Sequence, residues 1–229
     1  FTSRLSKYEI GPQKHEKAAA SFTQGFVDMR EGLEFLRRHV DAGRGIVATA
    51  VHRGGLTALT LTALLLERNT FNDPNKPEDG LQGFGIALSV AGIGVFLGAI
   101  LAPYGVAKFG RHRWIKFAMF ASAAAPLILA TSQTEIALSI TAFLASFFGQ
   151  NIKVTNDALV QSKIDDYYRG RVFAVYDVVV NGAIVSGGLI AALLLPTSGL
   201  TPNVPLVVSA VYLLVAVVVL RTAKFKAIY

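Results

Sequence analysis

The chain has 229 residues, of which 52% are hydrophobic and 16% are charged, and its formal net charge is +7. A soluble domain typically has about 25% charged residues, so this composition predicts a membrane protein whose solvent is the lipid bilayer. The chain has no cysteine, which excludes disulfides, thiolate zinc sites, iron–sulfur clusters and cysteine nucleophiles.

The N-terminal part of the chain is more polar than the rest. Residues 1–21 are mixed in charge and predict a flexible cytoplasmic linker. Residues 22–42 predict an amphipathic helix on the membrane surface or against a partner, because apolar residues recur there at three- and four-residue spacing. These residues are Phe22, Phe26, Met29, Leu33, Leu36 and Val40. No long apolar run precedes residue 46, so we expect no signal peptide.

Six apolar runs follow, and about 20 residues are needed to cross the hydrocarbon core. They cover residues 46–66, 84–107, 114–131, 136–157, 172–195 and 204–220. The pattern predicts an all-α membrane protein, with a six-span body at residues 43–221 and a cytoplasmic tail at residues 222–229. The third and sixth runs are the shortest.

Lysine and arginine gather in alternate connections. The segment KFGRHRWIK, the RGR at residues 169–171 and the tail RTAKFK all fall on one side of a six-span arrangement. The other connections carry few positive charges. The positive-inside rule therefore predicts a multi-pass protein of the cell membrane with both ends in the cytoplasm. Because orientation accounts for the positive charge, we expect no nucleic-acid partner.

Two ionisable residues lie inside the expected spans. With a rise of 1.5 Å per residue, Arg53 lies roughly 10 Å into the first run and Asp177 about 7–8 Å into the fifth. Both runs enter from the same side, so one hypothesis is an ion pair or a shared hydrogen-bond network. Asp177, with Asn181 one turn away, is the leading candidate for proton coupling, because a short carboxylate cannot reach the interface easily.

Other interpretations remain open for this polar set. Arg53 could reach the interface through its long stem, and the threonines beside it could bond their own backbone. His52 could relay protons because imidazole titrates near neutral pH, although a packing role is the preferred interpretation. Asn151 could line a polar path. Asp157 can reach Lys153 at i+4, or both could belong to a solvated helix end.

Familiar catalytic motifs are absent from the sequence. It contains no P-loop, no G-x-S-x-G and no H-E-x-x-H. We therefore expect neither an enzyme nor a bound metal or cofactor.

Three segments resemble the C-terminal half of a major facilitator transporter. AKFGRHR is similar to the family's loop motif, with Gly110, Arg111 and Arg113 matching. NDALVQSKIDDYYRGRVFAV, which holds Asp157, Arg169 and Arg171, is similar to the segment between spans ten and eleven in exporters of the enterobactin and macrolide-efflux type. EGLEFLRRH resembles the cytoplasmic helix before span seven. The resemblance implies that the loop-motif residues, together with Asp157, Arg169 and Arg171, act at a cytoplasmic gate.

The resemblance also implies a function. The six runs correspond to family spans seven to twelve, and Arg53, Asn151, Asp177 and Asn181 then lie on helices that line the central cavity. The expected function is proton-coupled export of an amphipathic small molecule by alternating access, with an N-terminal six-span half in the same or another chain. The alternative is a non-transporting subunit that uses this fold as a scaffold in a larger membrane complex.

Overall fold

The computed structural model describes residues 22–164 and 166–220, which are helical apart from short connections. The α-helices are α1 (Phe22–Arg38), α2 (Val40–Leu66), α3 (Pro77–Phe109), α4 (Arg111–Thr131), α5 (Glu135–Lys163), α6 (Asp166–Leu194) and α7 (Asn203–Leu214). Two π-helical turns, η2 (Glu67–Phe71) and η3 (Val215–Val219), extend α2 and α7. No β-strand occurs in these two ranges, and each of the six apolar runs lies mostly within a helical segment.

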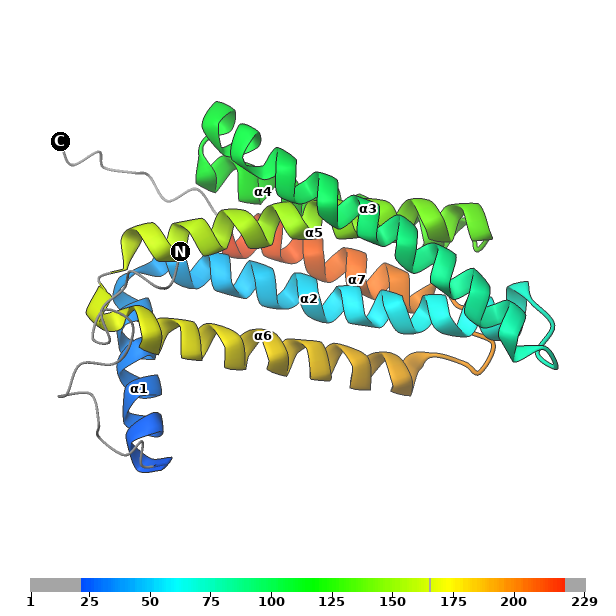
Figure 1. Ribbon diagram of the computed structural model, residues 1–229, viewed down its shortest axis with the longest axis horizontal. Coiled ribbons are helices and arrows are strands. Elements are labelled where there is room, and N and C mark those ends of the chain that lie inside the picture. The colour runs from blue at the N-terminus through cyan, green and yellow to red at the C-terminus, as the bar shows by residue number, and fades with distance from the viewer. Residues whose placement is uncertain (1–21, 165, 221–229) are drawn as a thin grey trace, which may run out of the picture.

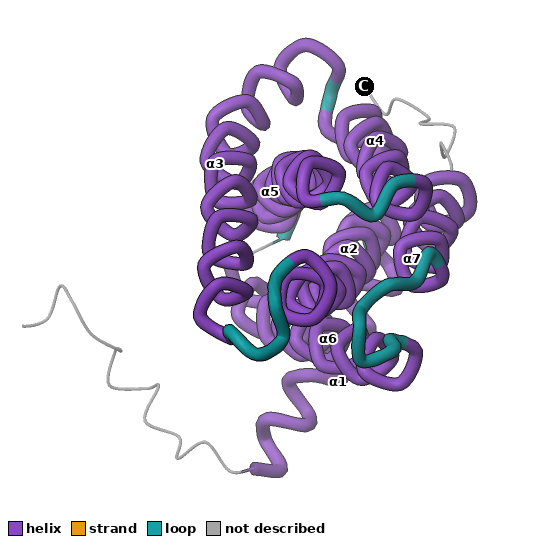
Figure 2. Tube along the Cα trace, turned by 90° about the vertical axis from the view of Figure 1, so that its right-hand side faces the viewer, coloured by secondary structure: helices purple, strands orange, loops and turns teal. Residues whose placement is uncertain are grey.

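The helices α2 to α7 form a bundle, and α1 lies across one end of it (Figure 1). Viewed end-on, α2 and α5 occupy the middle, with α3, α4, α6 and α7 around them (Figure 2). The most extensive contacts join α3 to α5, α2 to α6, and α4 to both α5 and α7. The α3–α4 and α5–α6 connections lie at the end that carries α1, whereas the α2–α3, α4–α5 and α6–α7 connections lie at the opposite end.

Small residues set how closely the central helices approach. The G-x-x-x-G of α3 packs on α5: a Cβ added to Gly94 would lie 2.5 Å from the Phe143 carbonyl oxygen, and one added to Gly98 would lie 2.5 Å from that of Phe147. Membrane helices lack a strong hydrophobic drive to associate, so such close backbone contact is a main source of their packing energy. Gly110 turns the chain between α3 and α4 with φ of +78°, a conformation that favours glycine.

Within the described ranges, four helices are long and apolar enough to cross a membrane. They are Pro77–Phe109, Arg111–Thr131, Glu135–Ser162 and Tyr167–Leu194. The last apolar helical segment, Asn203–Val219, is shorter than these. α2 is long, but His52, Arg53 and several threonines lower its hydropathy. The expectation of six spans therefore stays a prediction for α2 and α7.

The helix expected over residues 22–42 ends earlier, at Arg38. His39 leaves the helical conformation, with φ of −109° and ψ of 67°, and α2 begins at Val40. The chain turns here because α1 packs across the end of the bundle: Leu36 joins a buried cluster with Ile46, Val172 and other residues of α2, α5 and α6. Part of the apolar face of α1 thus packs against the bundle itself.

Candidate functional site

The structure does not pair Arg53 with Asp177. Arg53 makes no ion pair with any residue in the described ranges, and Asp177 is exposed on α6. The reason is the register of α2 against α6. Gly54 packs on the backbone of Ala183 and Gly187, which places Arg53 about 10 Å along the axis from Asp177. Counting residues from the start of each expected span gave Arg53 and Asp177 similar depths. The two spans, however, start at different levels along the bundle.

The polar side chains beside Arg53 and Asp177 bond their own helices. The Thr57 hydroxyl donates to the Arg53 carbonyl oxygen at 3.0 Å, and Thr49 and Thr60 make the same i−4 bond. The Asn181 amide donates to the Asp177 carbonyl oxygen at 2.8 Å. The interpretation that the threonines satisfy their own backbone is confirmed. Asp177 and Asn181 remain on a face of α6 that no other described helix covers.

His52 belongs to the packing between α2, α5 and α7, which agrees with the preferred interpretation of a packing role. Its side chain is 1% exposed and stacks on Tyr212 with ring centroids 4.8 Å apart. The Tyr212 hydroxyl donates to the His52 carbonyl oxygen at 2.7 Å. Gly149 leaves room for the imidazole, since an added Cβ would overlap it. His52 thus points away from α6 and supports helix packing.

Asn151 is also buried, between α4 and α5. Its side chain is 0% exposed. It accepts a hydrogen bond of 3.2 Å from the Trp114 indole nitrogen of α4 and donates one of 2.8 Å to the Phe147 carbonyl oxygen. The amide oxygen therefore joins α4 to α5, and the amide nitrogen bonds the backbone of α5 itself.

Asp157 joins α5 to α6. Its carboxylate lies 2.5 Å from the Lys153 ammonium, as the i+4 spacing predicts, and it accepts a hydrogen bond of 2.8 Å from the Tyr176 hydroxyl. Asn156, which is 0% exposed, packs against Gly45 of α2. Three helices therefore meet at one polar junction. Sequence reasoning missed Tyr176, although it directly precedes Asp177 and follows the RGR by one turn.

The two arginines of the RGR hold the ends of other helices. Arg171 pairs with Asp28 at 2.9 Å and with Glu31 at 3.0 Å, so it joins α6 to α1. Gly32 allows this approach, because an added Cβ would lie 2.7 Å from the Arg171 carbonyl oxygen. Arg169 donates to the carbonyl oxygen of Ile164 at 3.4 Å and so braces the α5–α6 turn. The sequence did not predict that the partners of Arg171 are acidic residues of α1.

The loop-motif residues lie at the same end. The Arg111 guanidinium donates to the Ser162 hydroxyl and thereby ties the start of α4 to the end of α5. Arg113 is exposed, and Gly110 makes the turn. All six residues assigned to a gate or loop motif thus lie at the end of the bundle that carries α1, which we call the basic end. It is defined by Arg38, Arg44, Arg111, Arg113, Arg169 and Arg171.

A cavity of about 150 Å³ lies between α2, α3 and α5. Its wall is mainly apolar, with a few hydroxyl groups. The lining includes Leu56, Thr60, Phe84, Leu88, Thr141 and Ser146. Thr60 and Thr141 already donate to the backbone, at 2.8 Å and 3.0 Å. Such a wall suits an apolar group better than a charged one.

The family model described as "Major Facilitator Superfamily" matches residues 46–227. The chain belongs to the major facilitator superfamily. It is also 31% identical over 172 residues to two curated relatives, the uncharacterized MFS-type transporters Rv0037c of Mycobacterium tuberculosis and Mb0038c of Mycobacterium bovis. The match covers 74% of this chain and 37% of each relative, so the chain spans well under half of their length. No solved structure gives a significant match.

Membership of the major facilitator superfamily agrees with the all-helical bundle and its apolar helices. It supports a multi-pass membrane protein with a role in transport and points away from an enzyme.

Proposed function

We infer that this chain is the C-terminal half of a secondary active transporter, and that the whole protein is a proton-coupled exporter of an amphipathic small molecule. It works by alternating access with an N-terminal six-span half, in the same chain or in another. The observation that carries this proposal is the uncovered face of α6, on which Asp177 and Asn181 are exposed.

A carboxylate on an otherwise apolar helix is unstable against lipid. An ionised group in the middle of a span costs a few kcal/mol on insertion scales, and a short Asp side chain cannot reach the interface as Arg or Lys can. In the working protein, this face of α6 therefore borders water or a polar partner surface. An N-terminal half that encloses a central cavity supplies such a surface. Asp177 is then positioned to exchange protons with that cavity.

The test uses the full-length protein in inside-out membrane vesicles, with ethidium as a fluorescent amphipathic probe. An imposed pH gradient should drive ethidium accumulation in wild-type vesicles, and nigericin should abolish it. Asp177→Asn keeps the shape of the side chain but cannot lose a proton, so it should reduce gradient-driven accumulation to background. The matched control is Ser186→Ala on the same helix, whose hydroxyl bonds only the Gly182 carbonyl oxygen in the described structure.

If Asp177→Asn vesicles accumulate ethidium in response to the pH gradient as well as wild-type vesicles do, then Asp177 has no role in proton coupling. The scaffold alternative predicts a different pattern: no ethidium movement in any vesicle, together with a partner that copurifies at fixed stoichiometry. The two functions are therefore separated by measuring ethidium accumulation and subunit composition on the same preparation.

A further inference from the structure

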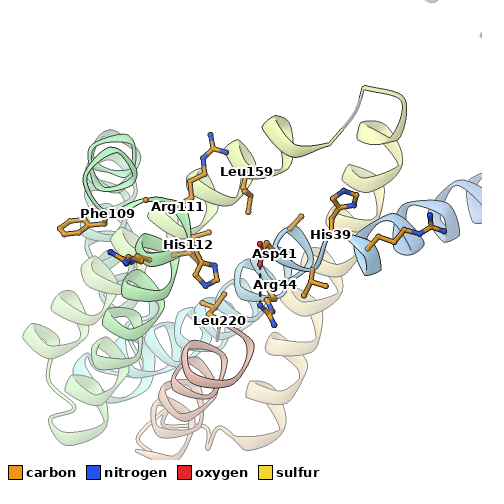
Figure 3. A pocket seen from close by; sticks show the side chains of 15 residues that line it. His39, Asp41, Arg44, Phe109, Arg111, His112, Leu159 and Leu220 are labelled. Carbon is orange, nitrogen blue, oxygen red and sulfur yellow. Dashed lines mark ion pairs between the residues drawn. The ribbon is translucent and has the colours of Figure 1, made fainter. Parts of the chain in front are cut away.

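A cavity of about 860 Å³ lies at the basic end (Figure 3). It opens between the α1–α2 junction and the α3–α4 turn. Its charged lining is strongly unbalanced, with four arginines and one carboxylate, Asp41. The arginines are Arg38, Arg44, Arg111 and Arg113. The role proposed above for Asp177 uses none of this cavity.

Local partners neutralise only part of this positive charge. Arg38 pairs with Glu34 at 2.8 Å, and Arg44 pairs with Asp41 at 3.8 Å. Arg111 bonds a neutral hydroxyl, that of Ser162, and neither it nor Arg113 forms an ion pair with a residue in the described ranges. At least two guanidinium charges therefore face this region without a described counter-charge.

Two helices begin at the same cavity. Val40 and Asp41 open α2, and Arg111 and His112 open α4. The residues that precede these helices, His39 and Gly110, make no side-chain capping bond. The first amide groups of a helix have no acceptor within it, and the helix dipole adds partial positive charge there. Both helix starts thus favour an anion, although Asp41 already places one carboxylate in the first turn of α2.

A buried donor or acceptor also lacks a partner in this region. The Nε2 atom of His112 is inaccessible to solvent and makes no hydrogen bond with the described residues. Figure 3 shows His112 extending from α4 toward the side of the cavity formed by Arg44 and Leu220. A buried polar atom without a partner is costly, and because this atom is closed to solvent, a group bound in the cavity would reach it only after the His112 ring rotates.

The rest of the wall is apolar. Phe109, Ile115, Leu159 and Leu220 line it beside the arginines. A phosphate group that carries hydrocarbon would satisfy both parts of the wall, whereas a fully polar anion would leave the apolar part unused. A phospholipid is such a molecule. Anionic lipids also concentrate at the membrane surface where basic residues gather.

We propose that this cavity binds an anionic phosphate group, that of an anionic phospholipid, through Arg111, Arg113 and the starts of α2 and α4, with the acyl chains along the apolar wall. The bound lipid links the α1–α2 junction to the α3–α4 turn. Because this inference does not rest on the transport proposal, Asp177→Asn should bind lipid like the wild type.

The experiment is native mass spectrometry of the full-length protein titrated with dioleoyl phosphatidylglycerol, with the zwitterionic dioleoyl phosphatidylcholine, whose net charge is zero, as the comparison. Each basic residue near a lipid surface contributes about 1 kcal/mol, so Arg113→Gln should weaken phosphatidylglycerol binding about fivefold. The double variant Arg111→Gln/Arg113→Gln should weaken it by more than about tenfold. Arg113→Gln is the safer variant for folding, because Arg113 makes no side-chain bond with the described residues. Arg68→Gln, an exposed arginine at the other end of the bundle, is the control and should change nothing.

A competition arm separates the two sources of phosphate. If millimolar inorganic phosphate leaves phosphatidylglycerol bound, the site takes the lipid head group. If inorganic phosphate displaces it, the site takes the phosphate anion itself, which still supports the anion site. Equal binding of the two lipids, or unchanged phosphatidylglycerol affinity in both arginine variants, would overturn the proposal.

Discussion

The two ends of the bundle differ in how they hold charge. At the basic end, charged groups help to join separate helices. Arg171 forms ion pairs that connect α6 to α1, and Asp157 of α5, which pairs with Lys153 on its own helix, accepts a hydrogen bond from Tyr176 of α6. At the opposite end, which we call the acidic end, Glu67, Asp79 and Glu135 line a cavity of about 280 Å³. None of these three carboxylates forms an ion pair within the described ranges.

This difference has a physical consequence. The charged groups of the basic end contribute to tertiary contacts, so their removal should loosen specific helices. The carboxylates of the acidic end repel one another, so their removal should relieve strain. Burial and the neighbouring charge of Glu135 raise the pKa of Glu67 above its usual value, and the hydrogen bond from Asn72 only partly offsets this. The three predictions below test this contrast.

The largest expected effect is overpacking at the basic end. A Cβ at Gly45 would lie 2.0 Å from the side-chain oxygen of Asn156, which is fully buried. Gly45→Leu should therefore destabilise the protein by about 1–3 kcal/mol. The matched control is Gly85→Leu in α3, where an added Cβ meets nothing within 4 Å. Thermal unfolding in detergent should show a lower Tm for the first variant alone, and an equal loss in both would argue against the tight α2–α5 contact.

The next effect is on the attachment of α1. Arg171→Ala removes the partner of both Asp28 and Glu31, so α1 should separate more often from α6. Exposed and half-exposed ion pairs are weak, and trypsin cleavage within α1 should accelerate by about threefold. Arg68→Ala, at the acidic end, should leave the cleavage rate unchanged. Equal cleavage rates in wild type and Arg171→Ala would mean that the apolar contacts of Leu36 hold α1 without the ion pairs.

The smallest effect concerns the acidic end and depends on pH. Because folding raises the pKa of Glu67 from 4.5, its protonated form is favoured in the folded state, and the associated stability is lost as pH rises through the raised value. Glu67→Gln should remove this part of the pH dependence and raise the Tm at pH 7 by about 1–2 °C. At pH 4, wild type and variant should unfold at similar temperatures. A Tm lowered at pH 7 would contradict the assignment.

The helices were largely predictable from sequence, because lipid favours long apolar runs and these are easily recognised. The connection at Gly110 and the i+4 pair of Lys153 and Asp157 also followed from local patterns. The contacts that depend on helix register could not be predicted from local patterns. Arg53 and Asp177 lie at similar distances from the starts of their expected spans, but Gly54 and Gly187 set a different alignment of α2 and α6.

Rotation about the helix axis is the second feature that the sequence did not predict. A single helical sequence does not reveal which face meets which neighbour when nearly all of its faces are apolar. His52 turns toward Tyr212 because Gly149 leaves space for its ring, and this space is created by a helix 97 positions away in the chain. The partners of Arg171 lie on α1, 143 residues from it in the case of Asp28. No local signal encodes such distant contacts.

The most direct test of the central claim asks whether the face of α6 that carries Asp177 borders water. This chain has no cysteine, so single cysteines can be introduced into it without background labelling from its own sequence. Asn181→Cys probes that face, and Phe120→Cys probes the exposed apolar face of α4. With the full-length protein in membranes, a charged methanethiosulfonate reagent should label Asn181→Cys rapidly and Phe120→Cys negligibly. Equal, slow labelling at both positions would show that α6 faces lipid there, and the transport pathway would have to lie elsewhere.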